Sequence, residues 1–181
     1  MDTILRTKLI IYYFTVILTA SGLFYGCHDD NSTYNDNQGF INKAHSSLQL
    51  KIAAGNLAVQ NSQADNVQDY GEEISREHSG TSEEIKKIAV ANSWIVPEEL
   101  LTPHQKQLSQ LQQQAVSDFD LDFAKLMVSS HEEAVNLFRI VSVNENEVYH
   151  SDVQTFARAT LPILESHLSE AKGILDQVDG I

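Results

Sequence analysis

Apolar side chains recur every three or four residues through most of the chain beyond position 38, which is the spacing of one face of an α-helix. No Asn-Gly or Asp-Gly turn separates alternating strand-like segments, and the sequence contains only three prolines. Ala, Leu, Gln and Glu, which favour helices, are abundant. We therefore predict an all-α domain of four helices, over residues 38–61, 66–92, 102–143 and 151–178.

Side chains that cap helix N termini stand where the last three predicted helices begin. Asp65, Thr102 and Ser151 are each followed three residues later by a glutamine, in the pattern of a capping box. Pro103 then occupies the first helical position after Thr102, where its missing N–H costs nothing. These signals predict the starts of the last three helices.

The lengths of the connecting segments predict how the helices are arranged. Only a few residues join the first helix to the second and the third to the fourth, so each of these pairs is expected to run antiparallel. The segment "SWIVPEELLTP" between the second and third helices is longer, and it could span about 35 Å when extended. Ferritin-like bundles contain a crossover connection of this kind. The predicted fold is thus a ferritin-like four-helix bundle over residues 39–178.

Three histidines lie near the midpoints of three of these helices. His78 and His167 fall within the apolar stripes of their helices, and His131 lies at the edge of its stripe, beside Phe138. Because all three are close to mid-helix, they are expected to share one layer of the bundle whichever way each helix runs.

Imidazoles inside a core need hydrogen-bond partners, and two explanations for the layer remain open. Zinc or copper would accept three imidazoles and leave a fourth position open. Alternatively, a satisfied polar layer fixes the register of the helices. Glu77 and Glu132 adjoin histidines in sequence, so they point about 100° away and are expected to be surface charges. The other candidate carboxylates are Asp120, three helical turns from His131, and Glu165; no Glu-x-x-His pair of a di-iron centre is present.

The first 26 residues have the order of a secretory signal peptide. Arg6 and Lys8 precede an apolar run over residues 9–20, small residues follow, and Gly26 directly precedes Cys27, the only cysteine. This arrangement resembles the lipobox of bacterial lipoproteins. We predict a signal peptide over residues 1–26 and a lipid attached to Cys27; an uncleaved N-terminal membrane helix is the alternative.

The residues after Cys27 and the overall charge predict where the protein works. Residues 27–38 are polar and lack apolar periodicity, so they are expected to form a flexible tether. A lipidated cysteine carries at least two acyl chains, which is enough for stable membrane attachment. The net charge of −13 disfavours nucleic acid as a partner. We expect a cell-envelope protein anchored in the outer membrane, facing the periplasm or the cell surface.

Two sequence patterns stand out, Phe-Asp followed by His-(x)6-Phe and Leu-Pro-(x)4-His. They are formed by Phe119, Asp120, His131 and Phe138, and by Leu161, Pro162 and His167. Through these patterns the chain resembles a bacterial family of exported outer-membrane proteins that share a domain of unknown function with a predicted ferritin-like bundle. The resemblance implies an all-helical fold and export. The family often has a glutamate where this chain has Lys51, which counts against a metal site if that glutamate is a ligand.

Two hypotheses for the function follow. The first is an envelope-anchored helical lipoprotein with a binding or structural role, for which Leu50 and Leu57, opposite the main stripe of the first helix, could contact an envelope protein or a second copy. The second is a metal-binding or redox bundle that uses His78, His131 and His167, with zinc or copper as the cofactor. The sequence lacks a Gly-x-Ser-x-Gly, a His-Glu-x-x-His and a phosphate loop, so enzymatic activity is not favoured.

Overall fold

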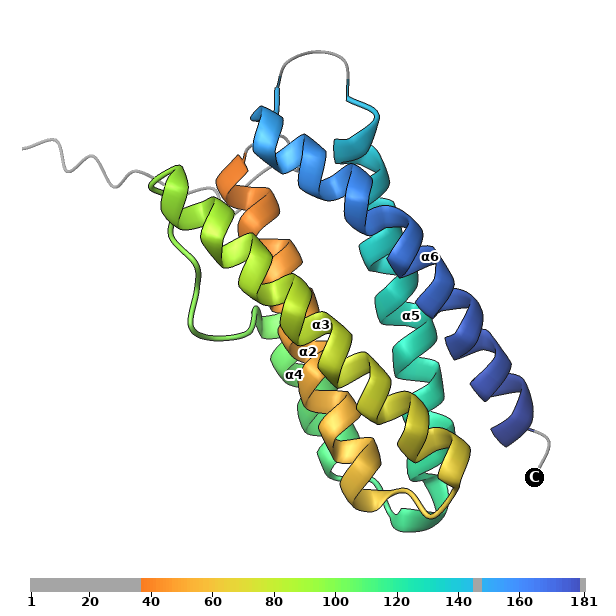
Figure 1. Cartoon of the computed structure of the whole chain (residues 1–181). Coiled ribbons are helices and arrows are strands. Elements are labelled where there is room, and N and C mark those ends of the chain that lie inside the picture. Colours follow the sequence, from red (N-terminus) through yellow and green to blue (C-terminus); the bar gives the residue numbers. More distant parts are fainter. Residues whose placement is uncertain (1–36, 145–147, 180–181) are drawn as a thin grey trace, which may run out of the picture. The chain divides into compact units, whose positions relative to one another are not determined.

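The computed structural model describes residues 37–144 and 148–179, and all regular structure in these residues is helical. The all-α fold predicted from the sequence is therefore confirmed. The predicted signal peptide, Cys27 and most of the predicted tether lie outside the described residues. The helices, drawn in Figure 1, are α2 (Asn37–Asn61), α3 (Asp65–Ala91), α4 (Thr102–Gln112), α5 (Val116–Ser142) and α6 (Ser151–Val178).

Four long helices form the bundle, and α4 is an addition to it. Helices α2 and α3 form one antiparallel pair, and α5 and α6 form another (Figure 1). Helix α3 is antiparallel to α6, since Asn66 of α3 donates to Gln177 at one end of the pair (2.6 Å) and Asn92, just after α3, donates to Asp152 at the other (3.2 Å). Helices α3 and α5 consequently run in the same direction, so the chain between them crosses the length of the bundle.

The prediction of a single helix over residues 102–143 is wrong. The chain leaves the helical path at residues 113–115, which separates α4 from α5. A continuous helix over that range would be about 63 Å long, whereas the other long helices are about 40 Å. Helix α4 belongs to the crossover, and the chain must reverse before α5 can pack beside α6.

Helix α4 is attached to α2 through a serine. The Oγ atom of Ser46 accepts a hydrogen bond from the backbone N–H of Leu101 (2.8 Å) and lies 2.7 Å from Nδ1 of His104. Ser46 and His104 are both buried. Helix α4 therefore covers a face of α2 that a bundle of four helices alone would leave in water.

Helices α2, α3, α4 and α6 begin within one residue of the predicted starts, but the predicted caps are not formed. Ala64 and Leu101 precede α3 and α4 without a side-chain cap, and His150, rather than Ser151, caps α6 by accepting from the N–H of Asp152. The glutamines of the predicted capping boxes bind backbone carbonyls further upstream instead, as Gln105 does at Leu100 (2.8 Å). The predicted helix starts are therefore correct, but the hydrogen bonds formed there differ from those of a capping box.

Two glycines let α2 and α3 approach closely. A Cβ atom added to Gly71 would lie 2.7 Å from the backbone oxygen of Gly55, and one added to Gly55 would lie 2.5 Å from the oxygen of Gly71. Real Cβ atoms do not come this close to backbone oxygens, so any larger residue would push the helices apart. This close approach fixes the register between α2 and α3 in the part of the pair that lies between His78 and the loop joining the two helices.

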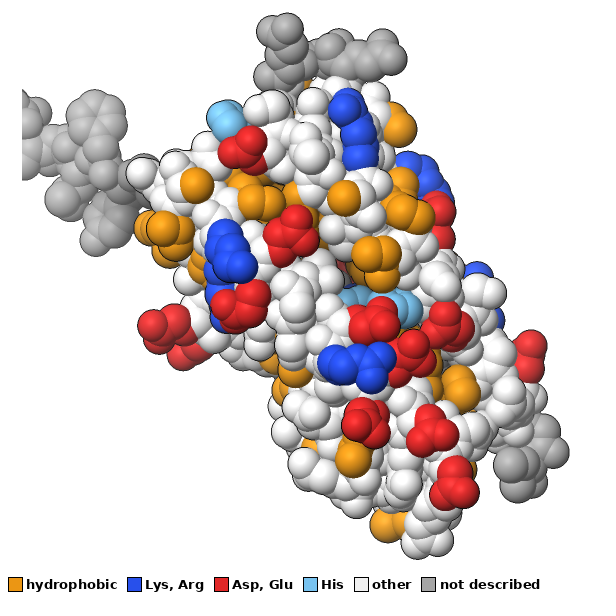
Figure 2. All heavy atoms as spheres, in the orientation of Figure 1, with side chains coloured by type: hydrophobic (Ala, Val, Ile, Leu, Met, Phe, Trp, Pro, Cys, Tyr) orange, Lys and Arg blue, Asp and Glu red, His pale blue; other side chains and the backbone are white. Residues whose placement is uncertain are grey.

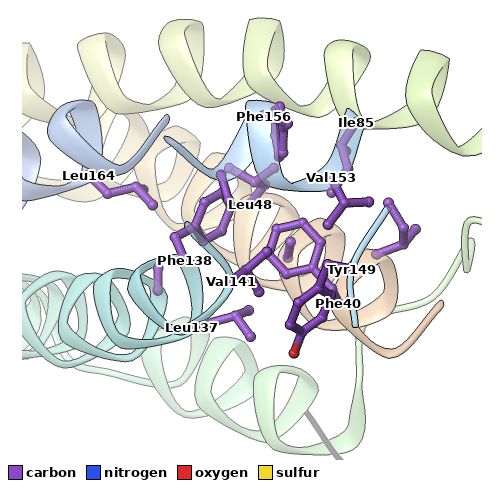
Figure 3. Packing of buried hydrophobic residues seen from close by; sticks show 14 of the residues in the cluster. Phe40, Leu48, Ile85, Leu137, Phe138, Val141, Tyr149, Val153, Phe156 and Leu164 are labelled. Atoms are coloured by element: carbon purple, nitrogen blue, oxygen red, sulfur yellow. The ribbon is translucent and has the colours of Figure 1, made fainter. Parts of the chain in front are cut away.

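The apolar core consists of two clusters. One contains Phe40, Phe138 and Phe156, whose rings pack edge-on or tilted with centroids 5.1–6.4 Å apart (Figure 3). The other contains Phe119 and Phe123, whose rings stack at 6.1 Å. Each buried aromatic side chain of this kind contributes about 2–3 kcal/mol to folding. The family-pattern residues Phe119 and Phe138 thus belong to the core.

The proposed contact surface on the first helix is not available as predicted. Leu50 is fully buried, and Leu57 packs partly buried against the second apolar cluster. Of the remaining family-pattern residues, Leu161 packs partly buried against the first cluster, while Pro162 is exposed within α6. None of the helices in the described part of the chain has both the length and the apolar character needed to cross a bilayer.

Candidate metal centre

A buried polar layer separates the two apolar clusters of the core. On α3 it lies between Ile74 and Ile85, on α5 between Met127 and Ala134, and on α6 between Leu164 and Ala171. Each of these gaps contains one buried histidine, accompanied by the buried Ser82 on α3 and Ser130 on α5. The histidines are His78, His131 and His167, of which 1%, 0% and 3% of the surface is exposed.

The three rings face one another at the centre of the bundle. Their centroids lie 5.0–5.7 Å apart, and one nitrogen of each ring can be chosen so that all three lie within 4.8 Å of one another. Nitrogens bound to one tetrahedral ion at bonds of ~2.1 Å would be about 3.4 Å apart. The nitrogens therefore need to approach one another by at most about 1.4 Å to hold a common ion.

Hydrogen bonds fix which nitrogen of His131 carries its proton. Nδ1 of His131 lies 2.8 Å from the backbone oxygen of Met127, and a carbonyl oxygen can only accept. Nδ1 is therefore the donor, and Nε2 carries the lone pair. Nε2 of His78 lies 3.1 Å from that lone pair, so in the absence of an ion His78 donates to His131.

His167 is held by a carboxylate. Its Nε2 lies 2.9 Å from Oε2 of Glu77, which leaves the lone pair of the neutral ring on Nδ1. Nδ1 is buried and finds no hydrogen-bond partner among the described residues. The backbone oxygen of His167 accepts from the hydroxyl of Tyr70 (3.2 Å), which further fixes this turn of α6.

His78 on α3 and His131 on α5 are both neutral at ordinary pH. Burial lowers the pKa of His78 and of His131 well below 6.5, and the nearby charge of Lys51 lowers both further. Neutral imidazole is the form that binds metal ions, so these side chains do not have to lose a proton first.

Glu77 is closer to the layer than the sequence suggested. Predicted to be a surface charge, it is 38% exposed and reaches His167 from the bundle surface, where it also lies 3.5 Å from Arg76. Figure 2 shows histidine side chains recessed among acidic ones near the middle of the face formed by α3 and α6. Because Glu77 is partly exposed and contacts the buried ring of His167, it lies between the histidine layer and solvent.

The other candidate carboxylates lie away from the layer. Glu132 pairs with Lys172 (3.0 Å) and Glu165 with Arg139 (2.8 Å), both near the surface. Asp120 lines a depression at the far end of the bundle, together with Asp118 and Asp179. None of these three provides a ligand for the histidines.

Sequence reasoning did not assign Lys51 to the site. Its side chain is fully buried on α2, and its Nζ donates to Oγ of Ser47 at 2.7 Å. Burial lowers its pKa from 10.5 to about 7, and Glu133 partly opposes this. The sequence pointed to this position only through the glutamate that the resembling family often has there, and packing shows that Lys51 is buried.

Comparison with known protein families gives one result. The family model described as "Domain of unknown function (DUF4142)" matches residues 28–174, which is most of the chain. The chain belongs to this family. The matched region of the DUF4142 domain includes Lys51 and all three histidines. Searches of curated proteins and of solved structures gave no match.

The DUF4142 match confirms the predicted relationship to a family of unknown function. Export and outer-membrane location stay predictions. The family description names no activity, and the histidine layer is the feature of the fold that bears on function.

Proposed function

We propose that this domain binds one transition-metal ion, zinc or copper, through His78, His131 and His167. The observation that carries the proposal is the buried Nδ1 of His167, which has no hydrogen-bond partner in the described part of the chain. An unpaired buried polar atom costs about 1–3 kcal/mol. A bound ion would use this lone pair.

The outward contacts of the rings support the same proposal. Metal-binding histidines usually donate their other N–H to a backbone carbonyl or a carboxylate, which holds the ring and sets the tautomer. His131 has such a contact with Met127, and His167 has one with Glu77. A polar layer that served only to fix helix register would be expected to satisfy all its polar atoms, which this layer does not.

The donor set favours zinc or copper over harder ions. Three imidazoles offer only nitrogen, whereas magnesium, calcium and manganese prefer carboxylate, carbonyl and water oxygens. Glu77 is the carboxylate in contact with a ring, and it is already held by N–H of His167.

The crossover between α3 and α5 also supports the predicted ferritin-like arrangement, but without the Glu-x-x-His pairs of a di-iron site.

Metal binding is tested on the full chain in a mild detergent. After treatment with a chelator, titration with zinc or copper is expected to show one ion per chain and to raise the melting temperature. An excess of 100 times the dissociation constant would stabilise the folded state by about 2.7 kcal/mol. Absence of stoichiometric binding and of any melting shift with either ion would refute the proposal.

We further propose that a lipid on Cys27 attaches the domain to the cell envelope, in the outer membrane. The support is the order of charge, apolar run and small residues before Cys27, together with a family match that begins at residue 28. A binding or structural role at the envelope is compatible with the helical fold, but its predicted contact through Leu50 is lost because that side chain is buried.

The anchor predicts that Cys27→Ser abolishes incorporation of a labelled fatty acid during expression in a Gram-negative host. The variant should also keep its uncleaved N-terminal segment, because cleavage follows lipidation. Labels of equal strength in the wild type and the variant would show that Cys27 is not the site of attachment. The measurement is a gel of labelled, affinity-purified protein.

A further inference from the structure

The buried layer has a fourth member on the fourth long helix. On α2, the first apolar cluster ends at Leu48 and the second begins at Ala54. Lys51 lies between them, with none of its surface exposed. Its position relative to the two clusters is the same as that of the three histidines on their own helices.

Contacts between α2 and α3 confirm this height. Gln49 donates to Oγ of Ser82 (2.9 Å), and Ser75 donates to the backbone oxygen of Ile52 (3.1 Å). Because the helices are antiparallel, residues between the two contacts on α2 face residues between them on α3. Between the contacts, Leu50 and Lys51 are the fully buried residues on α2, and His78 is the buried residue on α3. Lys51 and His78 therefore lie at one level.

The amine of Lys51 is poorly satisfied by its present contacts. An ammonium has three donors, and its hydrogen bonds are to Oγ of Ser47 (2.7 Å) and to the backbone oxygen of Ser47 (3.4 Å). No carboxylate in the described part of the chain forms an ion pair with it. Burying a charge without such a pair costs several kcal/mol of folding free energy. The fold nevertheless keeps Lys51 buried at the level of the histidines.

We propose that the amine of Lys51 is the fourth ligand of the metal ion, so that each long helix supplies one nitrogen. This inference rests on the proposed metal-binding function. On binding, the amine donates its lone pair to the ion, and a proton from any ammonium form leaves to solvent. Four neutral nitrogens would select zinc or copper and reject ions that need anionic oxygen ligands.

If Lys51 is a buried positive charge and not a ligand, its removal should change the metal affinity in the opposite direction. If Lys51 only places a positive charge in the layer, its removal should strengthen the binding of a cation. If its amine is a ligand, removal should weaken binding. The direction of the change therefore decides between the two roles.

The test compares zinc affinity in the metal-stripped full chain with that of Lys51→Leu. Leucine is chosen because the thioether of methionine can itself bind copper. Lys86→Leu is the matched control, since Lys86 is partly exposed and pairs with Glu83 on the bundle surface (2.9 Å). We expect Lys51→Leu to lower zinc affinity by about tenfold or more, and Lys86→Leu to leave it unchanged.

A second readout does not depend on the folding of the variant. Wild-type protein with labelled lysine Nζ nitrogens is loaded with an NMR-active cadmium isotope, and one lysine nitrogen is expected to show a one-bond coupling to cadmium. Bound cadmium without this coupling, or equal or tighter zinc binding by Lys51→Leu, would overturn the role of Lys51 and leave the three histidines. Failure of the wild type to bind either ion would overturn the metal-binding function as well.

Discussion

Replacing His167 with alanine is expected to lower zinc affinity by at least about 100-fold, because it removes both a ligand and its link to the bundle surface. His167 offers the buried Nδ1 that lacks a partner, and its Nε2 ties the ring to Glu77 at 2.9 Å. Alanine leaves two imidazoles, which hold zinc much less tightly than three. The measurement is competition with a chelator of known zinc affinity.

His45→Ala is the matched control for this prediction. His45 is 5% exposed and lies on α2, where its Nδ1 is 3.3 Å from the hydroxyl of Ser82, but it is not part of the three-ring cluster. Its removal should leave zinc affinity within about threefold of the wild type, a difference below ~1 kcal/mol. An equal loss in both variants would mean that disturbed packing, rather than a lost ligand, weakens binding.

Replacing Lys51 with methionine is expected to stabilise the metal-free protein by about 2–4 kcal/mol at neutral pH. Methionine has a similar length, fills the same buried space and carries no charge. Lys51 is fully buried and forms no ion pair with a described carboxylate, so the wild type bears the cost of desolvating its amine. The measurement is urea unfolding of the metal-free full chain, from which the free energy of unfolding is extrapolated.

The advantage of Lys51→Met should depend on pH in a defined direction. The pKa of Lys51 is about 7 in the folded protein and 10.5 in the unfolded chain. Between these values the unfolded chain holds a proton that the folded one has lost, so wild-type stability rises with pH. The gain from methionine should therefore be full at about pH 7 and below, and largely gone near pH 10.

Other titratable groups near Lys51 do not reverse the direction of this pH dependence. His78 and His131 have pKa values well below 6.5, and the pKa of Glu133 is lowered by its hydrogen bond with His104, so all three keep one charge state through the alkaline range. Lys86→Met, at a partly exposed position, should change stability by less than about 0.5 kcal/mol. Destabilisation by Lys51→Met at pH 7 would show that the amine supports the metal-free fold.

The sequence predicted the helices and the level of the histidines through periodicity. Apolar spacing on α3, α5 and α6 identified the residues that line the core, such as Ile74, Phe123 and Leu164. It also placed His78 and His167 within those stripes. These helices each bury one stripe, which is the situation that a helical wheel describes.

Helix α2 could not be interpreted in the same way. It packs against α3 and α5, and α4 covers a further face, so it is buried over much more of its circumference. Leu50 and Lys51 consequently point into protein although the wheel placed Leu50 outside. The break before α5 was missed because the Gln-rich run at residues 112–114 favours helix and contains neither Gly nor Pro.

The contact between Glu77 and His167 could not be predicted from one helix alone. Adjacent residues on α3 point about 100° apart, which correctly separates Glu77 from His78. His167, from α6, is buried, and Glu77 reaches its ring from the bundle surface. Only the packing of α3 against α6 brings the two together.

X-ray absorption spectroscopy of the zinc-loaded full chain tests the central claim most directly, because it reports the atoms bound to the ion. The account predicts a first shell of four nitrogens at about 2.0–2.1 Å, with the outer-shell scattering of three imidazole rings. A first shell dominated by oxygen, or the signature of fewer than three imidazoles, would contradict it.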